Sequence, residues 1–522
     1  MGSRSTTAVF LAPGGFTRVP SRGVSTAFVF RRRSVSPTAP RSETVTHGVV
    51  RAPEFPAGLI WIRPRTARSL ASFRGRFVLL DFWTYCCINC LHVLPELARL
   101  EERHGDVLSV IGILSPKFPE EADPRKALDA VARLGIRHFV ALDPTLDLWR
   151  RYGVRAWPTL VLIDPEGNIR HVASGEGQGA AISRLLDDAL TPDAPGLVRG
   201  PADYPPEPTP EPGFLAFPGK IHVDTELLAV ADSGHHRLVL QDRRRGTVRF
   251  IGRGVPGSED GPPSLATFRD PQGLVRRGDM LYVADRGNHL LRAVDLETDR
   301  VETLAGTGMR GWNPSFRPGT PARPARETAL ASPWDLAVLG GEIWIAVAGS
   351  HQLWSYDPRR ATVACRVGSG REDIEDGPAA FAALAQPSGL ASDGRRLVLA
   401  DAETSSVRLF DPALGRVTTL IGTGLFDFGD TTGEFSSTRL QHPLGVAWDG
   451  ERIWVADTYN GAVKILDSAR RTSTRVLDGL EEPGGIALDP KGGVWITETN
   501  RHRILRHDPG SGETSVHLFP AV

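Results

Sequence analysis

The sequence predicts a multidomain protein in which an α/β domain is followed by an all-β six-bladed β-propeller. Three observations predict it. Residues 50–190 alternate short apolar segments with amphipathic ones, residues 191–212 are rich in proline, and residues 213–522 repeat one strand pattern six times. The first pattern is typical of a sheet covered by helices, and the third of a ring of blades. A chain of 522 residues has room for both, since a domain usually takes about 100–200 residues.

Composition excludes some classes of partner. Hydrophobic residues make up 41% and charged residues 23%, which is typical of globular proteins. Lys and Arg together number 61, as do Asp and Glu, so net charge gives no reason to expect a nucleic acid or an anionic membrane as the main partner. The sequence holds no run of 18 apolar residues, and we therefore expect no transmembrane segment.

Residues 1–48 form the first segment. They carry seven Arg and no acid before Glu43, with many Ser, Pro and Gly residues and no sustained periodicity. We expect a disordered N-terminal extension. Two interpretations stay open: an Arg-rich targeting segment, and a start codon assigned upstream of a true beginning near Val50.

Short apolar runs and amphipathic runs alternate in residues 50–190. The apolar runs predict strands at Phe77–Trp83, Val107–Leu114, Phe139–Leu142, Thr159–Ile163 and Ile169–Ala173, and the amphipathic runs predict helices at Leu91–Arg103 and Pro124–Leu134. The last two strands flank a turn sequence, Asp164 to Asn168, that suits a hairpin. Residues 191–212 contain eight Pro and are expected to be a semi-rigid linker.

Six repeats fill residues 213–522. Each has a Pro marker, an apolar strand ending in Ala-Asp or a relative, a loop and a further strand; the markers are Pro218, Pro271, Pro333, Pro387, Pro443 and Pro483. Each repeat has room for about four short strands, which is one propeller blade. The third repeat has Val347 and the sixth Glu498 in place of the Asp. We interpret these acids as forming turns and hydrogen bonds between strands, with a ligand site at the channel mouth as the alternative. We interpret His235, His236 and His289 in the blade loops as structural, although His could also bind a metal.

Long inserts rich in Gly, Pro, Asp and Ser separate some of the blades, at residues 257–265, 309–328 and 426–438. They are expected to be surface loops, either solvated or in contact with a partner.

Three of the four cysteines lie within five positions, at Cys86, Cys87 and Cys90, where a strand gives way to a helix. The first helical turn presents free N–H groups and the positive end of the helix dipole, which favour a thiolate on Cys87. Two intervening residues allow Cys90 to lie one turn along and to close a disulfide. The fourth, Cys365, falls in an apolar strand and is expected to be a buried structural thiol.

The segment from Phe73 to Leu190 resembles the thioredoxin-like family, and the blade cores resemble NHL repeats. The string FWTYCCINCLHVLP, followed by a Pro-rich linker and six repeats, makes the chain similar to the thioredoxin-domain NHL-repeat family. The resemblance implies Cys87 as attacking nucleophile, Cys90 as resolving thiol and Asp81 as proton acceptor for Cys90. It implies that Trp157-Pro158 is the cis-proline loop, with Pro158 part of the active site and Trp157 and Cys86 as modulators. Ile88-Asn89 between the cysteines leaves the reduction potential open.

Neither a cofactor nor a metal is expected. A weaker alternative is the spacing Cys86-x3-Cys90, which resembles that of thioredoxin-fold copper chaperones, with His92, His138 or His171 as a further ligand.

The main functional hypothesis is a thiol–disulfide oxidoreductase or redox sensor whose partner is a protein held on the propeller face or in the thioredoxin groove. The alternative is a non-enzymatic two-domain scaffold with a degenerate thioredoxin fold. A propeller-centred lactonase or lyase lacks a convincing ligand set. We favour a cytoplasmic location, with export left open, because the sequence has no usable signal core and no disulfide scaffold. In the cytoplasm a C-x-x-C pair is more often catalytic or redox-sensing than structural. The oligomeric state is open.

Overall fold

A mixed six-stranded sheet organises residues 50–190 of the computed structural model, which describes residues 50–66, 68–190, 197–205, 213–311 and 315–520. The strands are β1 (Ile60–Arg63), β2 (Phe77–Trp83), β3 (Leu108–Leu114), β4 (Phe139–Leu142), β5 (Thr159–Ile163) and β6 (Ile169–Ser174). Their order is β1-β4-β3-β2-β5-β6. β2, β3 and β4 pair in parallel, whereas β1, β5 and β6 pair antiparallel with their neighbours. The expected hairpin at the end of the sheet is therefore present.

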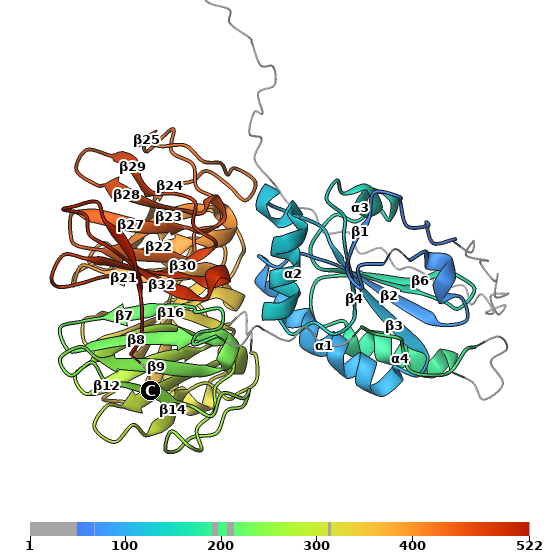
Figure 1. The fold of residues 1–522 in the computed structure, drawn as a ribbon, viewed down its shortest axis with the longest axis horizontal. Helices are drawn as coiled ribbons and strands as arrows, with labels where there is room; N and C mark the ends of the chain where they lie inside the picture. Colours follow the sequence, from blue (N-terminus) through green and yellow to red (C-terminus); the bar gives the residue numbers. More distant parts are fainter. Residues whose placement is uncertain (1–49, 67, 191–196, 206–212, 312–314, 521–522) are drawn as a thin grey trace, which may run out of the picture. The chain divides into compact units, whose positions relative to one another are not determined.

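Helices flank this sheet (Figure 1). They are α1 (Ile88–His104), α2 (Pro124–Arg133), α3 (Asp147–Arg151) and α4 (Gly179–Ala189), with single 3-10 turns η1 (Leu70–Phe73) and η2 (Pro119–Ala122). Apolar residues of α1 and α4 pack on one face of β2 and β3, and Leu148 of α3 packs on the other. Side chains alternate along β2, and Phe77 and Leu79 belong to the α1 side. Asp81 has the same parity and therefore points toward α1.

The sequence patterns located these elements closely but not completely. Helix α1 begins at Ile88, directly after Cys87, and not at the predicted Leu91. Its first turn therefore includes Cys90. Strand β1 and helix α3 are four and five residues long, too short to show a period. The sequence patterns did not predict helix α4, which begins with the small residues Gly179, Ala180 and Ala181.

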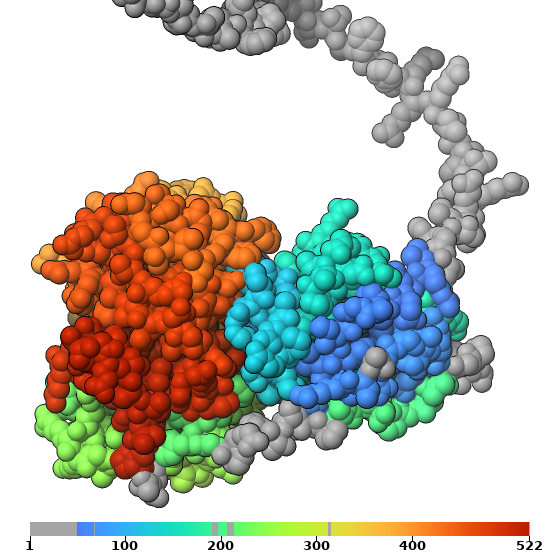
Figure 2. All heavy atoms as spheres, turned by 45° about the horizontal axis from the view of Figure 1, so that its top comes forward, coloured from blue at the N-terminus to red at the C-terminus, as the bar shows by residue number. Residues whose placement is uncertain are grey.

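Six sheets of consecutive strands build the propeller. Blade 1 contains β7 (Ile221–Val223), β8 (Leu227–Asp232), β9 (Arg237–Asp242) and β10 (Val248–Ile251), and blade 2 contains β11 (Pro271–Arg277), β12 (Met280–Asp285), β13 (Leu290–Asp295) and β14 (Val301–Ala305). Blade 3 contains β15 (Arg323–Pro324), β16 (Pro333–Leu339), β17 (Glu342–Val347), β18 (Gln352–Asp357) and β19 (Thr362–Val367). Figure 2 shows the chain colours passing from green to red through these blades.

The later blades follow the same plan. Blade 4 contains β20 (Gly377–Pro378), β21 (Pro387–Ser392), β22 (Leu397–Asp401), β23 (Ser406–Asp411) and β24 (Arg416–Ile421). Blade 5 contains β25 (Gly433–Glu434), β26 (Gly445–Trp448), β27 (Arg452–Asp457), β28 (Ala462–Asp467) and β29 (Thr472–Leu477). Blade 6 contains β30 (Pro483–Leu488), β31 (Val494–Glu498), β32 (Arg503–His507) and β33 (Thr514–His517). Side chains close the ring, as where Thr497 Oγ1 donates to the Gly219 carbonyl at 2.6 Å.

The repeat acids are buried and partly neutralised. In five blades the acid that ends β8, β12, β22, β27 or β31 accepts the backbone N–H of a residue 16 or 17 positions earlier and pairs with a cation on the following strand. In blade 4, for example, Asp401 binds Arg408 at 3.1 Å and both side chains are fully buried. Blade 3 has Val347 and Trp354 at the two positions, which replaces the ion pair by apolar contact. The acids therefore hold strands together, as interpreted from the sequence.

A second recurring contact joins each blade to the next. A 3-10 turn follows β8, β12, β17, β22, β27 and β31, one in each blade. The residue after that turn has a positive φ. In five blades this residue accepts a hydrogen bond from the backbone N–H of the residue that precedes the next Pro marker: His236 from Asp270, His289 from Ser332, His351 from Gln386, Ser405 from His442, and His502 from Phe217. The structural interpretation of His236 and His289 is thus confirmed.

Candidate functional site

The cysteine motif lies where β2 ends and α1 begins. Cys87 is the N-cap residue of α1, and its carbonyl accepts hydrogen bonds from the backbone N–H groups of Cys90 and Leu91 at 3.0 and 3.2 Å. Cys90 therefore lies one turn along the helix. The four cysteines are free thiols, with 7% of Cys87 and none of Cys90 exposed to solvent.

Asp81 is buried on the same side of the sheet. Neither of its carboxyl oxygens has a hydrogen-bond partner among the described residues. Burial raises the pKa of Asp81 to about 8. Burial also raises the pKa of the Cys90 thiol well above its ordinary value, and the neighbouring Cys87 sulfur and the Asp81 carboxyl raise it further. Asp81 is thus a carboxyl group that can exchange a proton near neutral pH and that interacts with Cys90.

The Trp157–Pro158 peptide bond is cis, as the sequence predicted. Trp157 packs in the same apolar cluster as Cys86, Cys87 and Cys90, and its indole Nε1 donates to the carbonyl of Ser115 at 2.9 Å. The predicted loop and the cysteine motif therefore share one cluster.

The propeller covers the thiols. Gln386, which precedes the Pro marker of blade 4, donates from Nε2 to the Cys86 carbonyl at 2.8 Å and accepts from the Ile88 N–H at 2.7 Å through Oε1. Asn89 donates to Glu372 at 3.4 Å. The backbone on both sides of Cys87 is thus bonded to a residue about 300 positions away, which accounts for the low exposure of Cys87.

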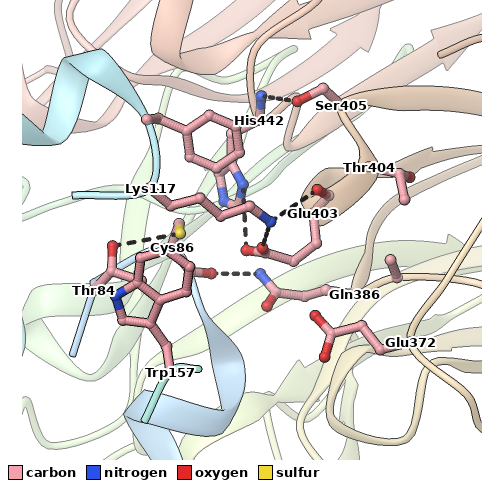
Figure 3. A network of polar contacts seen from close by, with 12 residues as sticks. Thr84, Cys86, Lys117, Trp157, Glu372, Gln386, Glu403, Thr404, Ser405 and His442 are labelled. Atoms are coloured by element: carbon pink, nitrogen blue, oxygen red, sulfur yellow. Dashed lines mark hydrogen bonds and ion pairs between the residues drawn. The ribbon is translucent and has the colours of Figure 1, made fainter. Parts of the chain in front are cut away.

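Cys86 takes part in a second group of polar residues (Figure 3). Its sulfur lies 3.5 Å from Thr84 Oγ1, and its N–H donates to the buried carboxylate of Glu121 at 3.2 Å. Its Sγ, one Glu403 oxygen and one His442 nitrogen all lie within 4.8 Å of one another, and the three residues are buried. We call these three residues the Cys86 cluster.

Electrostatics keep most of the Cys86 cluster neutral. Burial, together with Glu121 and Glu403, raises the pKa of the Cys86 thiol well above its ordinary value, and burial lowers the pKa of His442 to about 4. Glu403 is the charged member: burial opposes its ionisation, but Lys117 outweighs that effect and keeps the Glu403 pKa below its ordinary value. The Lys117 ammonium binds Glu403 Oε2 and also the Glu403 carbonyl, at 3.1 Å.

Several further contacts between residues 50–190 and the propeller use the same row of propeller positions. Of the six residues that precede the Pro markers, Ser332 bonds His92 of α1 at 2.8 Å and Glu482 bonds Arg133 of α2 at 2.6 Å. Gln386 and His442 meet the cysteine motif as described above. Sequence reasoning missed this row. The signal was the position itself, one residue before each Pro, because the residue type there differs in every repeat.

Two of the three inserts also meet this interface. Phe428 packs edge-on against Phe118 with ring centroids 4.9 Å apart, and Arg310 pairs with Glu176. The interpretation of inserts as contact loops therefore applies within the chain itself. Residues 1–48 and most of the Pro-rich segment lie outside the described residues.

The histidines of the copper-type alternative lie elsewhere. His92 bonds Glu176 and Ser332, His138 Nδ1 lies 3.6 Å from Glu101, and His171 is on β6. Among the residues that the structure describes, the group that Cys86 joins contains His442, which the sequence did not single out. Cys365 is a buried thiol in β19, as expected.

Comparison with known proteins agrees with this architecture. A thioredoxin-like family model matches residues 75–169, and an NHL repeat model matches residues 480–506. The chain thus combines a thioredoxin-like domain with an NHL propeller.

Relatives that match most of the chain define the family more narrowly. NHL repeat-containing protein 2 of Bos taurus is 36% identical over 530 residues, covering 90% of this chain and 71% of its own length. The chain therefore belongs to the family of NHL repeat-containing protein 2. Protein SUPPRESSOR OF QUENCHING 1, chloroplastic, of Arabidopsis thaliana is 35% identical over 504 residues, covering 89% of this chain and 47% of its own length.

Several relatives match the thioredoxin-like part alone. The thiol-disulfide oxidoreductase YkuV of Bacillus subtilis is 22% identical over 123 residues, which is 24% of this chain and 82% of that protein.

Among the described residues, no helix is both long and apolar enough to cross a membrane.

Proposed function

We propose that this protein is a thiol–disulfide redox protein, an oxidoreductase or a sensor, in which Cys87 and Cys90 interconvert between two thiols and one disulfide. The observation that supports it is the position of Cys87 at the first turn of α1, with Cys90 one turn along and the unpartnered Asp81 carboxyl beneath them. Backbone N–H groups at a helix start stabilise a thiolate there. The relative named as a thiol-disulfide oxidoreductase lends support from the same domain.

The proposed reaction balances as a two-electron exchange. The Cys87 thiolate attacks one sulfur of a partner disulfide, and the other partner sulfur leaves as a thiolate that takes up a proton. The ionised form of Asp81 takes the proton of Cys90, and the Cys90 thiolate attacks Cys87. The second partner sulfur leaves as a thiolate and takes up this proton. The partner is reduced to a dithiol and the Cys87–Cys90 disulfide forms.

The Gln386 contact helps to distinguish a sensor from an oxidoreductase. Cys87 is 7% exposed, so a protein partner reaches it only after the propeller has moved from the motif. This cover supports a sensor, in which formation of the disulfide alters the contact with the propeller. We propose that the partner is a protein and the location cytoplasmic.

A second candidate is a non-enzymatic scaffold. The burial of all four thiols favours it, because buried thiols exchange slowly.

The test poises purified full-length Cys86→Ser protein in graded thiol buffers, traps free thiols by alkylation and locates the label by mass spectrometry. We expect a reversible two-electron transition confined to Cys87 and Cys90, with Cys365 alkylated only after denaturation at every potential. Cys90→Ser should accumulate a mixed disulfide at Cys87. If Cys87 and Cys90 stay reduced across the whole range, the redox function is wrong and the scaffold remains.

A further inference from the structure

Two buried polar atoms of the Cys86 cluster, Glu403 Oε1 and His442 Nδ1, have no hydrogen bond among the described residues. They face each other at 3.8 Å, and both side chains are 3% exposed. An unpaired buried acceptor usually costs about 1–3 kcal/mol, so two in one place need an explanation.

The donor set identifies the missing partner. A thiol sulfur, an imidazole nitrogen and a carboxylate oxygen are the three ligand types that zinc takes in proteins, and three protein ligands leave the fourth position open. We propose that Cys86, Glu403 and His442 bind one divalent zinc ion between the thioredoxin-like domain and the propeller.

Distances and space agree with a tetrahedral ion. Metal–ligand bonds of about 2.0–2.3 Å place tetrahedral ligands about 3.5 Å apart. The Glu403 to His442 separation of 3.8 Å is close to this value, and the upper limit of 4.8 Å within the cluster requires about 1 Å of closure. A cavity of about 70 Å³ lies beside the cluster and is lined by Cys86 and His442 but not by Glu403, so a water molecule can serve as the fourth ligand on that side.

The charges around the cluster are compatible with a divalent cation. Lys117 is the cation that contacts the cluster, and it binds Glu403 Oε2 and leaves Oε1 available. Arg133, Lys220 and Arg286 also line the adjoining cavity. When zinc binds, Cys86 loses its proton, so the thiolate and the Glu403 carboxylate together balance the ion. Glu372 provides a further carboxyl group that interacts with Lys117 and Glu403.

Zinc at this position would join three distant parts of the chain. Cys86 follows β2, Glu403 lies in the 3-10 turn η7 (Ala402–Thr404) of blade 4, and His442 precedes the Pro marker of blade 5. The site does not use Cys87 or Cys90, and it goes beyond the proposed redox function.

The experiment measures zinc binding to the full-length protein, stripped with a chelator and kept reduced with a phosphine. Competition with a chromophoric chelator gives the zinc affinity, and Co²⁺ absorption reports thiolate ligation. The variants are Cys86→Ser, His442→Gln and, as matched control, Cys87→Ser/Cys90→Ser. Thermal melts without metal verify that each variant folds.

We expect one equivalent of zinc for the parent protein and for the control variant, with the Co²⁺–thiolate band present in both. Cys86→Ser should lose that band and bind at least 100-fold more weakly, and His442→Gln should bind at least 10-fold more weakly. Binding that survives Cys86→Ser, or that disappears in Cys87→Ser/Cys90→Ser, would place the metal at the redox thiols and overturn the proposal. A parent protein that binds no zinc would overturn it as well.

Discussion

The side-chain amide of Gln386 bonds the backbone on both sides of Cys87, at 2.8 Å to the Cys86 carbonyl and at 2.7 Å from the Ile88 N–H. A single propeller residue thus covers the residue proposed to be the nucleophile. Access to Cys87 depends on how firmly this pair of hydrogen bonds holds.

Gln386→Ala should expose Cys87. The substitution removes two hydrogen bonds worth about 0.5–1.5 kcal/mol each, so opening at Cys87 becomes about 10-fold more frequent. Timed alkylation with mass spectrometry measures the effect as a faster reaction of Cys87. Ser332→Ala is the matched control, because Ser332 holds the same position before a Pro marker but contacts His92. Equal rates in Gln386→Ala and the parent protein would show that Gln386 does not limit access.

The Arg133–Glu482 pair should stabilise the contact between α2 and the propeller. Glu482 is 3% exposed in its side chain, and one of its oxygens has no other partner among the described residues. Arg133→Met leaves a buried carboxylate uncompensated and should lower the free energy of unfolding by about 3 kcal/mol. Arg133→Met/Glu482→Gln should recover most of it, as measured by denaturant unfolding.

The control for that pair is Arg103→Met, which breaks an exposed contact with Asp187 and should cost less than about 1 kcal/mol. A double variant as unstable as Arg133→Met would contradict the ion-pair account.

Asp81→Asn should make the protein more stable while slowing thiol exchange. The folded protein holds a proton on Asp81 up to a pKa of about 8, whereas the unfolded chain loses it near pH 4. The stability that Asp81 contributes is complete below pH 4 and is lost as pH rises toward 8, with a slope of up to about 1.4 kcal/mol per pH unit. Asn cannot ionise, so the advantage of the variant should grow over this window. Urea unfolding at pH 5 and pH 8 tests it, and a constant difference would refute the assignment.

Acid should destabilise the protein through its buried blade histidines. Burial lowers the pKa of His351 to about 4, so the folded protein keeps this ring neutral while the unfolded chain protonates it below pH 6.5. The contribution of His351 is complete above pH 6.5 and is lost as pH falls toward 4. His351→Ser should flatten the fall in stability across that window. The fold itself uses Ser405 at this position of blade 4, where it accepts the same backbone N–H.

A suitable control for His351→Ser is His507→Ser, since His507 lies on β32 outside the contacts between blades. If both variants flatten the acid response equally, the blade contact is not its cause.

Sequence patterns predicted the elements whose formation depends on residues that are close together in the chain. Apolar runs located β2, β4 and β5 to the residue, because buried strands need continuous apolar side chains. The six Pro markers located the blades. The cysteine motif located the passage from β2 to α1, although the predicted helix began three residues late, at Leu91. These features depend on neighbours within about ten positions of the sequence.

The contact between the two parts of the chain was beyond such reasoning. Cys86 and His442 are more than 350 positions apart, and their proximity depends on how a finished helix meets a finished ring. The six residues before the Pro markers are Phe217, Asp270, Ser332, Gln386, His442 and Glu482. A search for a shared repeat pattern misses positions whose residue type differs in every repeat. At these positions the differences allow each residue to contact a different partner.

These six positions divide the work of the propeller between separate residues. Their backbone has positive φ in every blade, and their N–H groups join the blades in five of six cases, so the ring depends on their main chain. These hydrogen bonds use the backbone N–H, so the side chains can differ. Each blade presents a different chemical group at this position. Single substitutions at these positions can therefore change what one blade contacts without disturbing the backbone hydrogen bonds that hold the ring together.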